Sequence, residues 1–162
     1  MKEYFEVVDK NDKVIGRAPR SECHKNPNMI HRGILVIVTN SKGMILLQKR
    51  SMKKDLYPGL WGLSVGGHNR PGESYVHAAK REMKEELGTL AQMKEISKMI
   101  IRQKTETEID MIFEARIPMR KIKFNRREID EVKFFTYDEI IRLGEKLIPD
   151  VITVLNFYLK FK

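Results

Sequence analysis

The chain has 162 residues, 41% of them hydrophobic and 33% charged, with one cysteine and a formal net charge of +9. These values predict one folded domain over residues 1–162, argue against a disordered chain and exclude an intramolecular disulfide. No apolar run approaches the ~20 residues that span a bilayer, and we find no signal peptide, so we expect a cytoplasmic protein without a membrane partner. The positive charge favours anionic partners, which are phosphates, nucleic acid or an acidic membrane surface, while a solvated lysine-rich surface explains it equally well.

Two hairpins are predicted in the first third of the chain. Residues 4–16 place apolar stretches on both sides of a polar turn at residues 9–12. Residues 33–50 predict a second and stronger hairpin with its turn at Asn40–Gly43, and its β-branched first arm should be buried on both faces. Glycine and proline between residues 55 and 72 predict loops around a short strand near Trp61–Val65.

A helix is predicted from about Glu73 to Leu87, because apolar residues recur on one side and Gly88 supplies a C-cap. Alternating and β-branched residues predict three strands after it. These strands cover residues 95–103, 108–117 and 131–136.

Two shorter helices are predicted near the C-terminus. Thr136 and Glu139 form a capping box for one, and Pro149 with Asp150 begins a last helix that continues through residues 151–159. Strands mixed with a few helices predict an α/β or α+β fold, with a sheet covered on both sides.

The helix at 73–87 places three carboxylates on one face. Glu82, Glu85 and Glu86 are spaced i, i+3 and i+4, so they repel one another, and they lie near the helix C-terminus, where the helix dipole disfavours anions. One interpretation is a solvated acidic face, partly screened by Lys80 and Lys84. The other is a Mg²⁺ site, because this ion prefers oxygen ligands and bridges carboxylates to substrate phosphates.

The spacing around these glutamates resembles the Nudix box. That pattern is a glycine, five residues, a glutamate, seven residues, and then Arg-Glu-aliphatic-any-Glu-Glu-any-Gly-aliphatic. Residues 67–89 match it from Gly67 through Glu73 to the segment "REMKEELG" that ends at Gly88. The one departure is Thr89 in place of an aliphatic residue, which affects only the packing after the helix. Because so many positions agree at the correct spacing, the metal site is favoured over a solvated face.

The Nudix resemblance extends over most of the chain and implies an α/β/α sandwich around a central mixed β-sheet. It implies a hydrolase, dependent on Mg²⁺ or Mn²⁺, that cleaves the diphosphate linkage of a nucleoside diphosphate-X or related metabolite by attack of water on phosphorus. The substrate would then be a small, nucleotide-like diphosphate. Dimers are frequent in the family, so a homodimer is an open expectation.

The resemblance also assigns roles within the box. Three glutamates, with the carbonyl of the first glycine, would hold the metal and orient the attacking water, and one of the first two glutamates would accept its proton. An arginine and a further glutamate would brace the loop against the helix. The metal and catalytic set is Gly67, Glu82, Glu85 and Glu86, and the bracing pair is Glu73 and Arg81.

Within the family, the surroundings resemble type-1 isopentenyl-diphosphate isomerase. Those isomerases bind a second metal through three histidines and two glutamates, for which Mn²⁺ and Zn²⁺ are plausible ions. The segment "RSMKKDLYPGLW" also resembles the isomerases and makes Arg50 and Lys54 candidate diphosphate contacts. A working second site, a lost site and a coincidence all remain open for the matching residues here. They are His24, His31, His68, Glu106 and Glu108.

Two departures favour hydrolysis over isomerisation. Gly66 stands where the isomerases carry their catalytic cysteine, and Cys23 lies far away in sequence. The isomerases have also lost several carboxylates of the box and keep mainly the one that matches Glu86, whereas Glu82 and Glu85 are both present here. Isomerase-like activity and RNA 5′-end pyrophosphohydrolysis remain the alternatives. Nucleic acid is not favoured as a partner, because no binding motif appears and the basic residues are dispersed.

Some further residues are weaker candidates. Tyr57, Trp61 and Phe113 have rings that stack on a base in one interpretation and belong to the core or rim in the other. Several downstream acids are alternative metal ligands, ranked below the two glutamates that match the isomerase pattern. These acids are Glu114, Glu128, Asp130 and Glu131.

Overall fold

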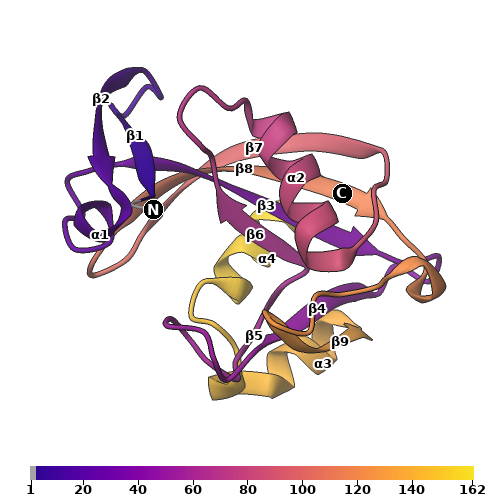
Figure 1. Cartoon of the computed structure of the whole chain (residues 1–162). Helices are drawn as coiled ribbons and strands as arrows, with labels where there is room; N and C mark the ends of the chain where they lie inside the picture. The colour runs from indigo at the N-terminus through magenta and orange to yellow at the C-terminus, as the bar shows by residue number, and fades with distance from the viewer. Residues whose placement is uncertain (1–2) are drawn as a thin grey trace.

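The computed structural model describes residues 3–162 as a mixed sheet with a few helices around it (Figure 1). Among these residues, no helix combines the length and apolar character that crossing a bilayer requires. The strands are β1 (Tyr4–Val8), β2 (Val14–Pro19), β3 (His31–Thr39), β4 (Ile45–Arg50), β5 (Trp61–Leu63), β6 (Val65–His68), β7 (Met93–Arg102), β8 (Thr107–Arg116) and β9 (Ile129–Phe135). The helices are α1 (Arg20–Cys23), α2 (Tyr75–Leu87), α3 (Tyr137–Leu143) and α4 (Val151–Leu159), with 3₁₀ turns η1 (Met119–Lys121) and η2 (Gly144–Lys146).

The sheet has two halves that diverge from a single point. In the first half, β3 pairs in parallel with β8 and antiparallel with β6, and β7 pairs with β8. The β1–β2 hairpin joins this half at the Val7–His31 pair. In the second half, β4 pairs antiparallel with β5 and with β9. Among residues 3–162, the backbone pairing between β3 and β4 is limited to Thr39–Ile45, and the halves splay apart from there (Figure 1).

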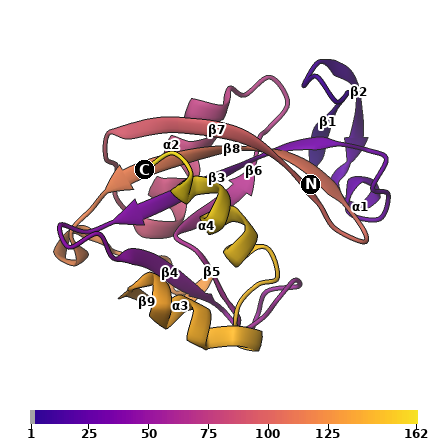
Figure 2. The same cartoon turned by 180° about the vertical axis from the view of Figure 1, so that it is seen from behind.

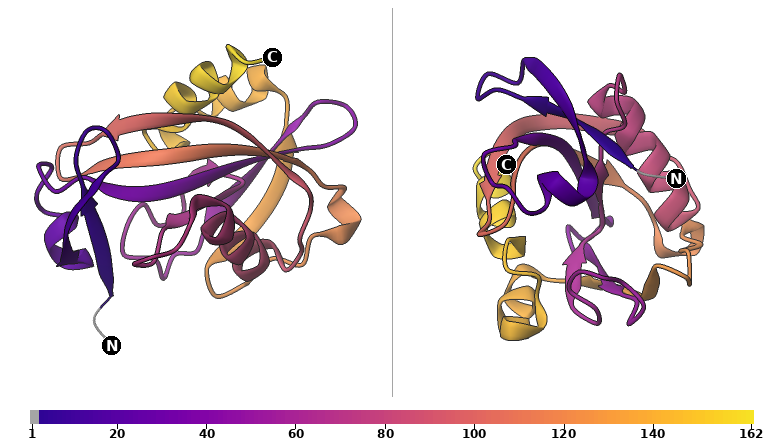
Figure 3. Two further views of the ribbon diagram at one scale, coloured as in Figure 1. Left: turned by 90° about the horizontal axis from the view of Figure 1, so that it is seen from above. Right: turned by 60° about the vertical axis from the view of Figure 1, so that its left-hand side comes forward.

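Helices cover both faces of the first half, as the sandwich prediction requires. Figures 2 and 3 show α2 on one face of β3 and β8 and α4 on the other. Side chains of β3 alternate between the two layers: Ile34 and Val36 pack in the cluster that contains Met83 of α2. Ile37 packs in the cluster that contains Val154 of α4. The expectation that this strand is buried on both faces is confirmed, because hydrophobic burial drives both layers onto it.

The second predicted hairpin is correct in its turn and wrong in its pairing. The Asn40 carbonyl accepts a hydrogen bond from the Gly43 amide at 3.1 Å, as expected for the turn. The two arms, however, separate after Thr39 and Ile45 because β8 and β6 occupy both edges of β3. The turn residues bring the two arms together at Asn40–Gly43. Beyond the turn, the more extensive hydrogen bonding with strands distant in sequence determines which strands the arms pair with.

The single short strand predicted near Trp61–Val65 is two strands. β5 pairs with β4 in one half of the sheet, and β6 pairs with β3 in the other. Ser64 lies between them and is fully buried. Its hydroxyl donates to the Leu46 carbonyl at 2.6 Å and accepts from the Val38 amide at 2.8 Å, so it joins the two halves.

The predicted helices are present, with one shifted boundary. α2 begins at Tyr75 because the Ser74 hydroxyl accepts from the His77 amide as an N-cap, which leaves Glu73 in the preceding loop. Gly88 ends the helix with φ of 64°, as a left-handed C-cap. The capping box of α3 and the start of α4 after Asp150 are both confirmed. β7, β8 and β9 confirm the three later strands to within two residues at each end.

We expect Gly88→Ala to destabilise the fold, with the left-handed backbone alone costing about 1–2 kcal/mol. A Cβ at this position would also overlap the Lys123 carbonyl oxygen. The free energy of unfolding in urea measures the effect. Gly16→Ala is the control, because a Cβ there meets nothing within 4 Å and the backbone is a strand. Equal stability of the two variants would contradict this account of the helix end.

Candidate active site

A cavity of about 580 Å³ opens where the two sheet halves diverge. Its lining draws on α2, on both halves of the sheet, on the N-terminus of α4 and on the loop of residues 51–60. Acidic and basic side chains from separate parts of the sequence therefore face one space. They include Arg50, Lys54, Glu82, Glu86, Glu106, Glu108, Glu128 and Asp150.

Two of the three box glutamates face this cavity across β6. A Cβ on Gly67 would overlap the Glu82 carboxyl, so glycine is required for that carboxyl to lie against the strand. Glu86 is only 5% exposed; it accepts a hydrogen bond from Gln48 Nε2 at 2.8 Å and a longer one from the Gly66 amide at 3.4 Å. Burial raises the pKa of Glu86 to about 8, with a contribution from the nearby Glu82 charge.

Arg81 connects the glycine-rich loop to the helix. Its guanidinium donates to both carboxylate oxygens of Glu73, at 2.9 and 2.8 Å, and to the His68 carbonyl at 3.0 Å. It also donates to Glu82 at 2.6 Å. The bidentate pairing fixes the loop before α2, as the box resemblance implied for Glu73 and Arg81.

Glu85 is placed differently from the other two box glutamates. Its side chain is 47% exposed and lies 3.5 Å from both Arg70 and Arg81. It is outside the cavity lining, beside the Arg81 guanidinium that it shares with Glu82. The helix face therefore presents two carboxylates to the cavity and one to its edge.

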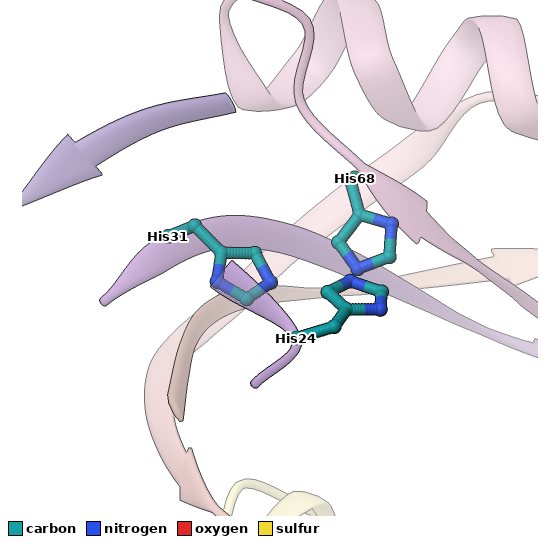
Figure 4. Close-up of side chains that lie close together, drawn as sticks. All are labelled: His24, His31 and His68. Carbon is teal, nitrogen blue, oxygen red and sulfur yellow. The ribbon is translucent and has the colours of Figure 1, made fainter. Parts of the chain in front are cut away.

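All five residues of the isomerase-like set lie together, although they come from separate elements. The rings of His24, His31 and His68 converge, with one nitrogen of each within 4.8 Å of the others (Figure 4). Glu108 lies 2.8 Å from His68 Nε2 and 3.4 Å from His31 Nε2. Glu106 lies 3.3 Å from His24 Nε2.

The donor atoms of this set fit a divalent cation. The Nε2 atoms of His24 and His31 and one oxygen of Glu106 are buried without a hydrogen-bond partner among the described residues. Buried polar atoms are rarely left unpaired, and imidazole with carboxylate suits Mn²⁺ or Zn²⁺. Burial and the neighbouring His68 lower the pKa of His24 to about 4, so this ring is neutral and has a free lone pair. Phe5 stacks on His31 and His68 at centroid distances of 4.9 and 4.6 Å and covers the cluster.

The two predicted diphosphate contacts line the cavity, and each side chain also interacts with another group of the protein. Arg50 Nε donates to the Leu56 carbonyl at 2.9 Å, and Lys54 pairs with Glu128 at 3.1 Å. Tyr57 also lines the cavity, and its hydroxyl donates to Gln103 at 3.2 Å.

The remaining weaker candidates lie outside the cavity lining, with Glu128 excepted. Trp61 packs edge-on against Phe135 in the core, and Phe113 is buried beneath α2. Glu114 pairs with Lys162 near the C-terminus. Asp130 and Glu131 are exposed on β9.

Two cavity residues escaped the sequence reasoning. Gln48 holds Glu86, and nothing local to its strand indicates that role. Asp110 follows Glu106 and Glu108 with the same period of two. The alternation of side chains along a strand was therefore the only sequence feature that could have placed it on their face of β8. Burial and the neighbouring Glu108 raise the pKa of Asp110.

Comparison with known proteins identifies the class. The NUDIX domain model matches residues 29–155 of the chain. The chain therefore belongs to the NUDIX domain family, and its fold and box place it with the hydrolases of that family.

Two relatives span nearly the whole chain. A Nudix hydrolase of Pseudomonas aeruginosa is 30% identical over 155 residues, which is 94% of this chain and 90% of that protein. Isopentenyl-diphosphate Delta-isomerase 2 of Photorhabdus laumondii is 34% identical over 161 residues, which is 95% of this chain and 88% of the isomerase. The chain is thus similar to both branches that the motifs suggested.

Two solved structures show the same fold. A Deinococcus radiodurans crystal structure superposes with a TM-score of 0.83 at 24% identity, covering 96% of this chain and 99% of that one. The NUDIX domain of Shewanella oneidensis NrtR, solved in complex with ADP ribose, gives 0.63 at 16% identity, covering 77% and 83%.

We expect Glu73→Gln to lower the free energy of unfolding at pH 7 by about 1–3 kcal/mol, because it weakens charge-assisted hydrogen bonds to Arg81. Burial opposes ionisation of Glu73, but bonds from Arg81 and the Arg70 amide outweigh it and hold its pKa below 4.5. The stabilisation is therefore complete above pH 4.5 and is lost as pH falls through the lowered pKa. Denaturation from pH 7 to pH 3 measures it: the two curves should converge at acid pH, and exposed Glu95→Gln should follow the wild type. A constant difference across this range would refute the ion-pair explanation.

Proposed function

We propose that this chain cleaves the diphosphate linkage of a small, nucleotide-like molecule in a reaction that depends on Mg²⁺ or Mn²⁺. The observation that carries the proposal is the juxtaposition of Glu82 and Glu86 with cationic side chains across one cavity. Carboxylates there would bind the dication, and Arg50 and Lys54 would face the phosphates. The absence of a membrane-spanning helix in the described residues and the NUDIX match agree with a cytoplasmic enzyme.

The metal set would be Glu82, Glu85, Glu86 and the Gly67 carbonyl. When bound, the dication supplies charge neutralisation of the diphosphate and acidifies the attacking water. Arg81 holds Glu82 in place from outside the cavity, and Gln48 and the Gly66 amide hold Glu86. Of the two candidate proton acceptors, Glu82 lines the cavity and Glu85 lies at its edge, which supports Glu82.

The support for a nucleotide-like substrate comes from a solved structure with a similar fold, and not from a contact within this chain. The NrtR domain was solved with ADP ribose, and its fold is shared here. A screen with Mg²⁺ and with Mn²⁺ should include nucleoside triphosphates, sugar nucleotides, dinucleotides, CoA, capped RNA and isopentenyl diphosphate.

Isomerisation of isopentenyl diphosphate is the second candidate, favoured by the assembled histidines and glutamates. The proposed hydrolysis ranks above it because the described cavity lining contains no cysteine. Cys23 is fully buried in a separate cluster with Phe5 and Ala18, and Gly66 occupies the isomerase cysteine position. Formation of the isomer by the purified protein would reverse this ranking.

Glu86→Gln should reduce turnover at saturating Mg²⁺ by at least about 100-fold, because a lost metal ligand removes several kcal/mol of transition-state stabilisation. Glu85→Gln should also reduce turnover, and EDTA should stop the reaction until Mg²⁺ is restored. Glu145→Gln changes an exposed acid outside the cavity and is the matched control. Wild-type turnover in both Glu85→Gln and Glu86→Gln would contradict the assignment of these glutamates to the metal site.

His68→Asn should lower the amount of Mn²⁺ that the protein retains after dialysis, because the second cluster loses a ligand. His77→Asn, on the exposed surface of α2, should retain the wild-type amount. Elemental analysis measures both independently of activity. If His68→Asn retained as much Mn²⁺ as the wild type, the second metal site would be excluded.

A further inference from the structure

Asp110 is a buried carboxyl group that faces the cavity without a partner. It lies on β8, is 3% exposed and contributes to the cavity lining. Within residues 3–162, its side chain makes no hydrogen bond and no ion pair. A Cβ on Gly33 would overlap its Oδ1 atom, so the neighbouring strand leaves room for this group. Because Asp110 contributes to the cavity lining and its oxygens are not sealed in the core, a molecule in the cavity can reach this carboxyl and pair with it.

The part of the lining shared with α4 differs from the part that contains the box. Ile101, Ile148 and Val151 contribute apolar surface. The other polar groups there pair with one another: Tyr57 donates to Gln103, and Gln103 donates to Asp150. His24 and Glu106 also line the cavity with an unpaired atom each, but both belong to the candidate metal cluster. Among the described residues beside α4, Asp110 is therefore a group that an incoming molecule can pair with.

The chemistry of that molecule follows from these surroundings. A hydrocarbon chain would suit the apolar surface but would leave Asp110 unpaired. An anionic group would be repelled by Asp110 itself and by Asp150, which also lines the cavity. A hydroxyl group both donates and accepts, so it pairs with a carboxyl in either protonation state, while the carbon face of a sugar ring packs on apolar side chains.

We propose that Asp110 is a specificity-determining residue that selects substrates whose organic moiety is a hydroxylated, sugar-type ring over those with a hydrocarbon moiety. The proposal rests on the proposed function, since it takes the diphosphate to lie against the box glutamates. It adds the residue that recognises the other end of the substrate and the kind of group recognised.

The test compares two esters that share the ADP half, ADP-ribose and the tetrahydrofurfuryl ester of ADP, which has the same ring size without the terminal ribose hydroxyls. Steady-state kinetics with Mg²⁺ give the ratio of their kcat/KM values for each variant. The wild type should prefer ADP-ribose by about tenfold or more, since a site that pairs with a substrate hydroxyl discriminates against its absence. Asp110→Leu should bring the ratio close to one while the tetrahydrofurfuryl ester is still cleaved.

Asp110→Asn preserves the shape and should lower the ratio several-fold, which keeps the test informative if the leucine variant does not fold. Asp130→Asn alters an exposed acid outside the lining and should keep the wild-type ratio. A wild type without preference, or folded Asp110 variants with the wild-type ratio, would overturn the inference and leave the proposed function standing. Cleavage of neither ester by the wild type would count against the proposed function itself.

Discussion

The site depends on one buried hydroxyl group. Ser64 donates to the Leu46 carbonyl and accepts from the Val38 amide, so it ties β4 to β3 where their direct pairing has ended. The chain passes at this residue from one half of the sheet to the other. The two halves of the sheet are held together at Ser64 and diverge beyond it. The space between the diverging halves is the polar cavity, and it lies beside hydrophobic cores on both faces of the sheet.

Two groups of acids reach that cavity from opposite faces of the same half-sheet. Glu82 and Glu86 come from α2, and the Glu82 carboxyl can lie against β6 because Gly67 presents no side chain there. Glu108 and Asp110 come from the face toward α4, over Gly33. Crowding so many carboxylates in one space costs free energy, and cations are the means of offsetting it: Arg81 within the protein, and a dication from solution under our proposal.

Sequence reasoning succeeded where the deciding interactions are local. The spacing from Gly67 to Gly88 located α2 and its acidic face, and Thr136 with Glu139 located the start of α3. It also grouped the three histidines, but through the resemblance to the isomerases and not through a physical argument from the residues. It failed where distant strands compete for pairing: the arms on either side of the Asn40 turn diverge, and one expected strand divides at Ser64. Gln48 escaped for the same reason, since its partner Glu86 lies on a distant element.

The attachment of the N-terminal segment has a further consequence. β1 meets the sheet at the Val7–His31 pair and has a small core of its own around Phe5 and Cys23. His24 belongs to this segment, whereas His31 and His68 belong to the main sheet. A cation held by all three would act as a cross-link between them. Protease resistance of residues 3–24 would then vary with metal supply, and trace-metal limitation would loosen this segment before it affected the rest of the described chain.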